Sequence, residues 1–406
     1  MRARSLIPIL LLCLWAVDAK ALDISDNFTL TGYGDVRVVA PPDTVSYVDG
    51  GLGKLRFGGG TTTVHFAEGI AQGEYSLTDT LSAVALVRAE PTDRDVIDPL
   101  ETYVRYTPAE TDALSWSIKS GVFFPSISLE NDDLGWTSPY TLTPSAINSW
   151  IGDELRTIGS EATVRWQNDF GTLSLVGALT CCNDEAGTLM ADRGWALDDR
   201  PTGLFERVRL PEATEKLFGA QLLNARTGMF DEIDGQPGWY AGGGWQLPGI
   251  VQLSVIRYDN EGNPRARTAR DTAWDTRFWA LGARTSWQSF TLIAQAMRGD
   301  TVIAGHGFVS QTQFQSAFLL ASYDWNDLRF SAREEAFATR NVGANNANLN
   351  EDGDAFTAAV SYTPHDWVRL ACEFIALHSR RGEYVTAGLP YDQNDSQFQI
   401  STRLFF

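Results

Sequence analysis

Basic residues at alternating positions along the sequence are the side chains that could most readily act on other molecules. They are Arg37, Arg105, Lys119, Arg165, Arg329, Arg333, Arg369 and Arg403. The acidic residues at equivalent alternating positions are fewer, namely Asp35, Glu101, Glu335 and Glu373. Rings of basic side chains around a water-filled passage favour anions. This pattern predicts electrostatic selection of small solutes, unless the basic residues pair with the acids and only stiffen a wall.

A second group of charged residues lies in an apolar and acidic segment, residues 123–161, between two predicted strands. Its acids are Glu130, Asp132, Asp133, Asp153 and Glu154, and its large apolar residues include Trp136, Tyr140, Ile147 and Trp150. Connections longer than about 12–15 residues are usually functional or disordered, and this composition argues against disorder. Thr143 followed by Pro144 predicts a helix N-cap and first turn. We expect a short helix over residues 145–151 that ends at Gly152.

Residues for catalysis or metal binding are scarce. None of the four histidines, His65, His306, His365 and His378, stands in a spacing typical of a metal site or a catalytic triad. Residues 348–354 are acidic, but the twelfth position of a calcium loop would be Ala359 instead of a glutamate. We interpret them as a surface loop. The sequence therefore predicts no enzymatic activity, no cofactor and no metal centre.

The N-terminus predicts export from the cytoplasm. Arg2 and Arg4 precede an apolar run over residues 6–17, and small residues at 19 and 21 are typical of a signal-peptidase site. The run is shorter than the roughly 20 residues that span a bilayer, so we expect residues 1–21 to be a cleaved signal peptide. Cys181, Cys182 and Cys372 would then remain, an odd number that does not indicate a disulfide framework. The adjacent pair could be redox-active or metal-binding, although no cluster of ligands lies near it in sequence.

The elements that carry these residues are predicted strands. Polar and apolar residues alternate with a period of two in segments of about ten residues over most of residues 22–406, as in 28–39, 113–123, 328–335 and 367–374. Very short connections, such as 78–80, 168–171, 326–327 and 364–366, alternate with long ones, such as 183–215, 260–272, 300–311, 340–353 and 379–394. Short turns at one rim and long loops at the other are typical of a transmembrane β-barrel.

Two further features favour this barrel over a soluble sandwich. The last predicted strand, residues 396–406, ends on Phe406, and aromatic residues gather at predicted strand ends, as the interfacial girdles of a membrane barrel require. The aromatic residues are Tyr106, Trp166, Trp287, Tyr323, Trp325, Tyr362 and Trp367. We therefore expect an all-β, antiparallel, up-and-down barrel. It has 18 strands if residues 200–229 form a hairpin of the wall and 16 if they form a loop.

In these features the chain resembles the bacterial outer-membrane porins, and more loosely the phosphate-selective type. The resemblance covers residues 22–406 in architecture and ends on the strand that closes with Phe406. In porins a long loop after the fifth strand folds into the barrel and narrows the pore. The fifth predicted strand ends at Phe123, so the resemblance implies that residues 124–157 are this constriction loop, with its acids facing the basic wall and its aromatic residues as anchors. The alternative is a surface loop over the barrel mouth or a neighbouring subunit.

The resemblance also implies a function, a location and partners. It implies passive diffusion of small hydrophilic solutes, anionic or zwitterionic, through the outer membrane of a Gram-negative cell. The implied partners are membrane lipid, lipopolysaccharide (bridged by divalent ions at the acidic loop in one alternative), the barrel-assembly machinery and two further copies in a homotrimer. The strong overall acidity, a formal charge of −19, disfavours nucleic acid. The alternative is a non-conducting barrel that binds surface polysaccharide or acts as an adhesin, with Trp195 and Tyr391 as candidate exposed aromatic residues.

Overall fold

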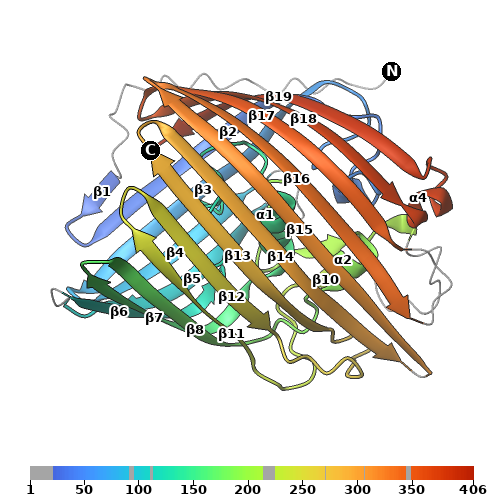
Figure 1. Ribbon diagram of the computed structural model, residues 1–406, viewed down its shortest axis with the longest axis horizontal. Helices are drawn as coiled ribbons and strands as arrows, with labels where there is room; N and C mark the ends of the chain where they lie inside the picture. Colours follow the sequence, from blue (N-terminus) through green and yellow to red (C-terminus); the bar gives the residue numbers. More distant parts are fainter. Residues whose placement is uncertain are drawn as a thin grey trace.

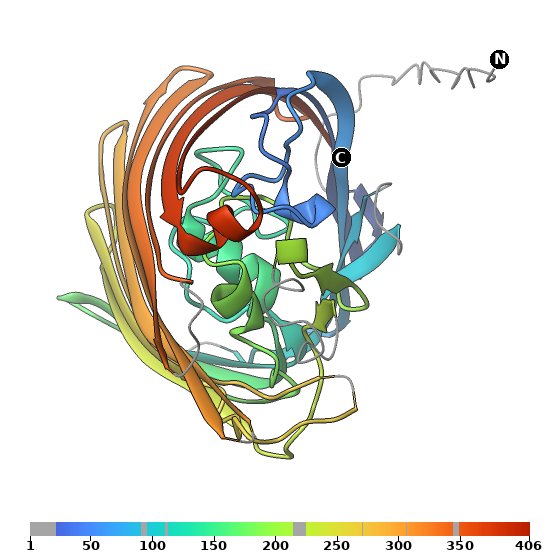
Figure 2. The same ribbon diagram turned by 90° about the vertical axis from the view of Figure 1, so that its right-hand side faces the viewer.

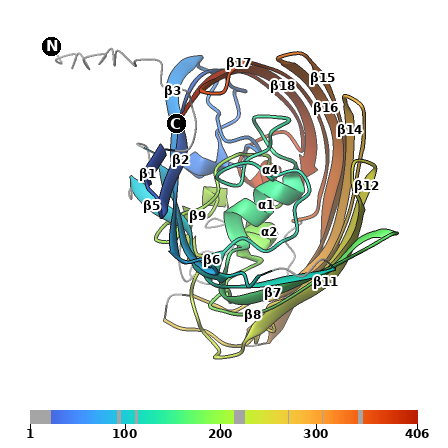
Figure 3. The same cartoon turned by 90° about the vertical axis from the view of Figure 1, so that its left-hand side faces the viewer.

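The chain forms a closed antiparallel ring of 16 strands (Figures 1 and 3). The computed structural model describes residues 22–90, 96–109, 113–213, 225–269, 271–305, 307–343 and 349–406. The first seven strands of the ring are β2 (Phe28–Ala40), β3 (Thr63–Thr78), β4 (Leu81–Ala89), β5 (Ile97–Tyr106), β6 (Leu114–Phe123), β7 (Thr157–Asn168) and β8 (Gly171–Cys181). The other nine are β11 (Gly238–Leu247), β12 (Val251–Asp259), β13 (Asp275–Trp287), β14 (Phe290–Gly305), β15 (Phe308–Trp325), β16 (Leu328–Gly343), β17 (Glu351–His365), β18 (Val368–Arg381) and β19 (Asp392–Phe405).

Two pairings make the ring continuous. β19 pairs with β2, with Arg403 opposite Asp35, and so joins the two ends of the chain. β8 pairs with β11, with Thr180 opposite Gly238, so the long connection between them leaves no gap in the wall. A short strand, β1 (Leu22–Ser25), pairs with β2 outside this ring. The described strands of the ring are thus each paired on both sides, as a sheet in an apolar environment requires.

The described residues of 200–229, which are 200–213 and 225–229, contribute no strand to the wall. β9 (Arg207–Arg209) and β10 (Arg226–Gly228) pair only with each other, in a separate small sheet. The prediction of 16 strands is therefore correct and that of 18 is wrong. Residues 214–224 of this region lie outside the described part of the chain.

The period-two alternation separates two environments, as the sequence predicts. On β15, Leu319 faces outward and is 50% exposed, whereas its neighbour Leu320 faces the lumen and is fully buried. The strict period-two pattern of residues 100–106 predicts that Leu100 and Val104 share one face, and this is wrong: Leu100 is fully buried, whereas Val104 is 42% exposed. The pairing of β4 with β5 shifts register between Leu86 and Val87, and this irregularity turns Leu100 inward.

Long connections fold into the lumen, where much of the buried core lies (Figures 2 and 3). We call residues 124–156, between β6 and β7, the constriction segment. The described residues of the connection between β8 and β11, 182–213 and 225–237, form the plug segment, and residues 41–62 form the β2–β3 loop. Helices α1 (Ala146–Glu154) and α2 (Thr188–Asp192) belong to the first two, the 3-10 helix η1 (Tyr47–Asp49) to the third, and α4 (Gly382–Thr386) follows β18. No helix among the described residues has the length and apolarity needed to cross a membrane.

Helix α1 begins and ends later than its sequence indicates. Its N-cap is Ser145, whose hydroxyl accepts a hydrogen bond from the Asn148 amide, instead of Thr143. Thr143 is unavailable because its amide donates to Glu373 (3.1 Å) and its carbonyl accepts from Arg333 (2.9 Å). Gly152 lies within the helix instead of ending it. A Cβ there would lie 3.1 Å from the Trp136 ring, so the glycine permits close packing of that ring.

Candidate functional site: the narrowed lumen

The constriction segment is clamped to the barrel wall by Arg333 of β16. Its guanidinium is fully buried and forms ion pairs with Glu130 of the segment at 2.7 Å and with Glu335 of β16 at 2.8 Å. Glu335 also accepts a hydrogen bond from the Ala146 amide (2.7 Å), at the start of α1. Glu373 of β18 likewise accepts from the Leu142 amide (2.6 Å). Two wall carboxylates therefore hold the backbone of the segment directly.

Two other acids of the constriction segment make half-exposed ion pairs with the wall. Asp132 pairs with Arg284 of β13 at 2.6 Å, and Asp133 pairs with Arg369 of β18 at 3.1 Å. Arg284 also donates to the Tyr140 hydroxyl (2.5 Å). These two acids therefore lie on the side of the segment that faces the basic wall. They contact the wall arginines directly, because the segment lies against β13–β18.

Aromatic side chains fix the segment at both ends. Trp136 stacks on Phe124 with ring centroids 4.4 Å apart, and its indole nitrogen donates to the Asn148 carbonyl (2.9 Å). Trp150 is buried and packs edge-on against Phe314 of β15 and other rings of the lumen core. Of the remaining predicted anchors, Ile147 is also buried in this core, and Tyr140 lies beneath Arg284 and Arg329. Trp136 also packs against the buried cluster that includes Ile70 of β3 and Leu86 of β4, so all four contact other parts of the lumen.

The last two acids, Asp153 and Glu154, face the plug segment instead of the wall. Asp153 pairs with Arg193 at 2.6 Å, and Glu154 accepts from the Leu189 amide at the start of α2 (2.8 Å). Burial raises the pKa of the Glu154 carboxyl to about 7. The two inner segments therefore bind each other through α1 and α2.

The plug segment is held to the wall by further buried ion pairs. Asp199 pairs with Arg37 of β2 at 2.5 Å and with Arg56 of the β2–β3 loop at 3.0 Å. Both guanidinium groups lower the pKa of Asp199 to about 2, against the effect of burial. Arg200 pairs with Glu90 at 2.9 Å, just beyond the end of β4.

A third cluster joins the plug segment to the strands near the C-terminus. Lys54 of the β2–β3 loop pairs with Glu351 of β17 at 2.5 Å, and Arg381 of β18 pairs with the same carboxylate at 3.3 Å. Arg381 also donates to the Asp192 carbonyl (2.8 Å) and Lys54 to the Arg193 carbonyl (2.8 Å), both in the plug segment. Glu351 is fully buried, so the interpretation of residues 348–354 as a surface loop is wrong at this position.

Part of the lumen stays hollow near the short turns, as a polar cavity of about 550 Å³. Its wall includes inward-facing residues of β3–β8, β11 and β12, and one side is residues 124–136 of the constriction segment. The polar and charged residues at its surface include Gln72, Glu101, Lys119, Asp132, Asp133, Thr163, Arg165, Thr172, Ser174, Gln246 and Gln252.

The predicted basic residues differ in their access to this cavity. Arg165 of β7 is exposed and has no ion-pair partner among the residues that the structure describes. Lys119 of β6 pairs with Glu161 at 3.0 Å, and Arg105 of β5 lies 3.8 Å from Glu74. The other five are held by acids or carbonyls: Arg37 and Arg333 as above, Arg369 by Asp133, Arg403 by Asp35 at 2.8 Å, and Arg329 by Asp324 at 2.6 Å.

Sequence reasoning missed the residues of the plug segment and several wall arginines, among them Arg88, Arg284 and Arg381. Trp195, expected as an exposed aromatic residue, is fully buried in the lumen core, whereas Tyr391 is 46% exposed. In β13, Arg284 alternates with the outward-facing residues Trp279 and Leu281, so the same period-two pattern predicts that Arg284 faces inward. The acids and bases of residues 182–213 have no such periodicity, and only the length of the connection signals a folded insert.

No family model matches this sequence, and no curated protein matches it. Solved structures do match. The chain is similar to OmpF of Salmonella typhi in complex with daunomycin, with a TM-score of 0.55 and 12% identity over 94% of this chain and 98% of that one. It is similar to an anion-selective porin from Comamonas acidovorans, with a TM-score of 0.52 and 10% identity over 93% of this chain and 99% of that one. It also matches OmpT, an outer membrane protein of Vibrio cholerae, with a TM-score of 0.51 and 11% identity over 96% of this chain and 100% of that one.

These matches, together with the closed ring of 16 strands, define the fold as a porin-like β-barrel. The predicted fold class is therefore confirmed. Because the identities are near one residue in ten, the similarity concerns the fold, and the function must be argued from the lumen of this chain.

Proposed function

We propose that this protein is an outer-membrane porin that admits small hydrophilic solutes by passive diffusion, with no catalytic step. The observation that supports this most is the polar cavity of about 550 Å³ inside a closed barrel. The outer face is apolar, with exposed aromatic side chains near the short turns, including Trp287, Phe290, Tyr323 and Trp325. An apolar band with an aromatic girdle around a polar interior is the arrangement of outer-membrane barrels.

The proposal includes a route to the outer membrane of a Gram-negative cell. Residues 1–21 would direct export, although they lie outside the described part of the chain. The barrel-assembly machinery would recognise β19 and the terminal Phe406. Lipopolysaccharide would surround the barrel, and three copies would form a homotrimer. In this proposal, residues 22–406 are the barrel domain and residues 124–157 its constriction loop.

The solute preference that we propose, anionic or zwitterionic, depends on Arg165. The excess of basic residues on the inner face has little effect on solutes where the basic groups pair with acids, because a paired charge produces a weaker field. Arg165 is exposed to the cavity without such a partner among the described residues. A cation at the wall of a narrow passage raises the local concentration of anions.

Planar-bilayer recording of the purified protein tests the proposal. A diffusion channel gives discrete conductance steps that scale with salt concentration, and an anion-selective one gives a reversal potential of anionic sign in a salt gradient. Absence of steps over a range of voltages would reject the channel.

Arg165→Glu should shift the reversal potential toward cation selectivity, because it reverses the exposed charge of the cavity. Lys119→Glu should shift it less, since Lys119 is already neutralised by Glu161 at 3.0 Å. Arg340→Glu is a matched control: the charge change is the same, but Arg340 faces outward and pairs with Asp352. An unchanged reversal potential in Arg165→Glu would remove this residue from the solute path.

One observation favours a second candidate, a non-conducting barrel that binds a surface polysaccharide or acts as an adhesin. The plug segment fills the lumen on the side of the long connections and is held by buried ion pairs such as Asp199 with Arg37. If the plug never leaves, solutes do not pass. Asp199→Asn weakens these pairs, so it should raise the conductance or open probability of a channel and leave a non-conducting barrel silent.

A further inference from the structure

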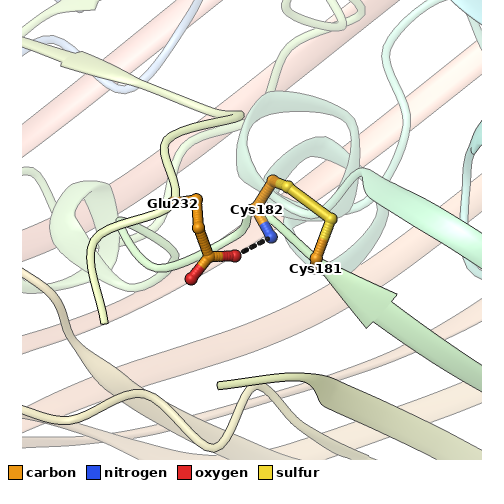
Figure 4. Close-up of side chains that lie close together, drawn as sticks. All are labelled: Cys181, Cys182 and Glu232. Carbon is orange, nitrogen blue, oxygen red and sulfur yellow. Dashed lines mark hydrogen bonds between the residues drawn. A yellow bond between two sulfur atoms is a disulfide. The ribbon is translucent and has the colours of Figure 1, made fainter. Parts of the chain in front are cut away.

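The adjacent cysteines Cys181 and Cys182 form a disulfide at the junction between the wall and the plug segment (Figure 4). Cys181 is the last residue of β8, where it pairs with Ile158 of β7. Cys182 is the first residue of the connection that enters the lumen. Both residues are partly exposed, so the disulfide is open to small reagents.

The first residues of this connection also bind its last residues. The Cys182 amide donates to the Glu232 carboxylate (3.1 Å). The Asp184 carboxylate accepts from the amides of Ile233 (2.5 Å) and Asp234 (3.0 Å), and its own amide donates to the Asp231 carbonyl (3.3 Å). These bonds join residues 182–184 to residues 231–234, just before β11. We call these two stretches together the base of the plug segment.

The disulfide holds the backbone conformation on which the base depends. Cys182 has φ of +66°, in the left-handed region that residues other than glycine seldom adopt. A disulfide between neighbouring residues closes a small ring that includes their peptide unit and restricts its rotation. After reduction the ring opens, and Cys182 can return to an extended or right-handed conformation. Its amide then points away from Glu232, and the base loses a bond.

We propose that Cys181–Cys182 is a thiol–disulfide exchange site for low-molecular-weight thiols, and that its reduction loosens the base of the plug segment. In the first step, the thiolate of an external thiol attacks one cysteine sulfur, forms a mixed disulfide and releases the other cysteine as a thiolate, which takes up a proton. A second external thiolate then attacks the external sulfur of this mixed disulfide, and the remaining protein cysteine leaves as a thiolate that takes up a proton. The net result is two protein thiols and one oxidised external disulfide, a transfer of two electrons and two protons.

Charge at the site selects among thiols. A Glu232 carboxylate oxygen and the two cysteine sulfurs lie within 4.8 Å of one another, and Asp184 and Asp234 are grouped equally closely around Glu232. A carboxylate so near the sulfurs repels a thiolate that carries further negative charge, and it repels less a thiolate whose own ammonium group offsets that charge. The site should therefore react faster with an aminothiol such as cysteamine than with anionic glutathione.

Peptide mapping and hydrogen exchange on the full-length protein in detergent test this proposal. Without reductant, alkylation should label Cys372 and spare the peptide that contains Cys181 and Cys182. After cysteamine treatment, both should be labelled, and amides of residues 182–184 and 231–236 should exchange about five to ten times faster, as expected for the loss of hydrogen bonds of ordinary net strength. Labelling of the pair without reductant, or unchanged exchange after reduction, would overturn the proposal.

Three variants serve as controls. Cys181→Ser with Cys182→Ser should exchange fast at the base with or without thiol, whereas Cys372→Ser should respond like the wild type. Glu232→Gln removes the carboxylate, so it should reduce the preference for cysteamine over glutathione; an unaltered preference would reject the electrostatic selection. None of these readouts depends on conduction, so the proposal stands or falls independently of the proposed channel.

Discussion

Arg333 shows most clearly how single residues determine the shape of the lumen. It is fully buried and binds acids of both the wall and the constriction segment, together with the carbonyls of Thr143 and Pro144 (2.9 and 3.1 Å). Its guanidinium donates hydrogen bonds to carboxylates and backbone carbonyls that would otherwise be buried without a hydrogen-bond partner. The guanidinium suits this role because its planar donors point in several fixed directions at once.

Arg333→Ala should detach the constriction segment and lower the free energy of unfolding by about 3–5 kcal/mol, because it leaves Glu130 and Glu335 buried without their cation. The measurement is thermal or urea unfolding in detergent. Arg369→Ala is the matched control: its pair with Asp133 is half-exposed and should cost no more than about 1 kcal/mol. Equal losses in the two variants would contradict the distinction between the buried clamp and the exposed pair.

At the scale of elements, helices α1 and α2 meet through a carboxyl group that holds its proton up to neutral pH. Burial raises the pKa of Glu154 to about 7, and burial together with Glu383 raises that of Asp192 to about 7. In an unfolded chain these groups would titrate near 4.5 and 3.8. Between these values and pH 7 the docked form binds more protons than the released form, so docking weakens as pH rises through about 7.

Docking of the plug segment should therefore be tighter at pH 5.5 than at pH 8. Hydrogen exchange of α2 amides, corrected for the intrinsic pH dependence of exchange, measures it. Glu154→Gln keeps an uncharged group of similar size and should remove part of the pH dependence. If the α2 amides of the wild type become more protected from exchange as pH rises, the Glu154 carboxyl does not hold a proton in the docked form.

The wall elements and the inward-folded constriction loop with its short helix could be predicted from sequence, but the pairings inside the lumen could not. Strand alternation requires only local information, so the inward orientation of Arg37, Arg165 and Arg333 followed from period two. Pairing depends on contacts between distant segments. Asp199 and Arg56, for example, are 143 residues apart, and nothing local marks them as partners. The same reason explains the error at Thr143, whose backbone amide donates to Glu373 of β18, a tertiary contact that overrides a good local capping signal.

At the scale of the whole molecule, one acidic residue conflicts with the apolar exterior. Glu334 of β16 faces outward and is exposed, and in register it lies between Leu319 of β15 and Phe356 of β17, which are 50% and 42% exposed. These neighbours place it within the apolar band and away from the aromatic residues near the short turns. A charged side chain there faces lipid in a single barrel and a protein surface in an oligomer.

Glu334→Leu should raise the free energy of unfolding in lipid vesicles by about 1–2 kcal/mol, because acidic residues on a lipid face cost less than the roughly 2–4 kcal/mol of basic ones. Ala332→Leu, on the same face of β16, controls for added apolar surface. A loss of stability together with dissociation in mild detergent would instead place Glu334 at an interface between copies.

The contacts that hold the plug segment also imply an order of assembly. Arg37 of β2 holds the segment through its ion pair with Asp199, whereas Glu351 of β17 and Arg381 of β18 hold it through hydrogen bonds with the Trp195 amide and the Asp192 carbonyl. These strands lie at opposite ends of the chain and come together only when β19 pairs with β2. The complete set of these contacts can therefore form only once the ring has closed, so full docking of the plug segment follows closure of the wall. A plug segment that docks into a closed ring can undock again while every strand pairing of the wall stays intact.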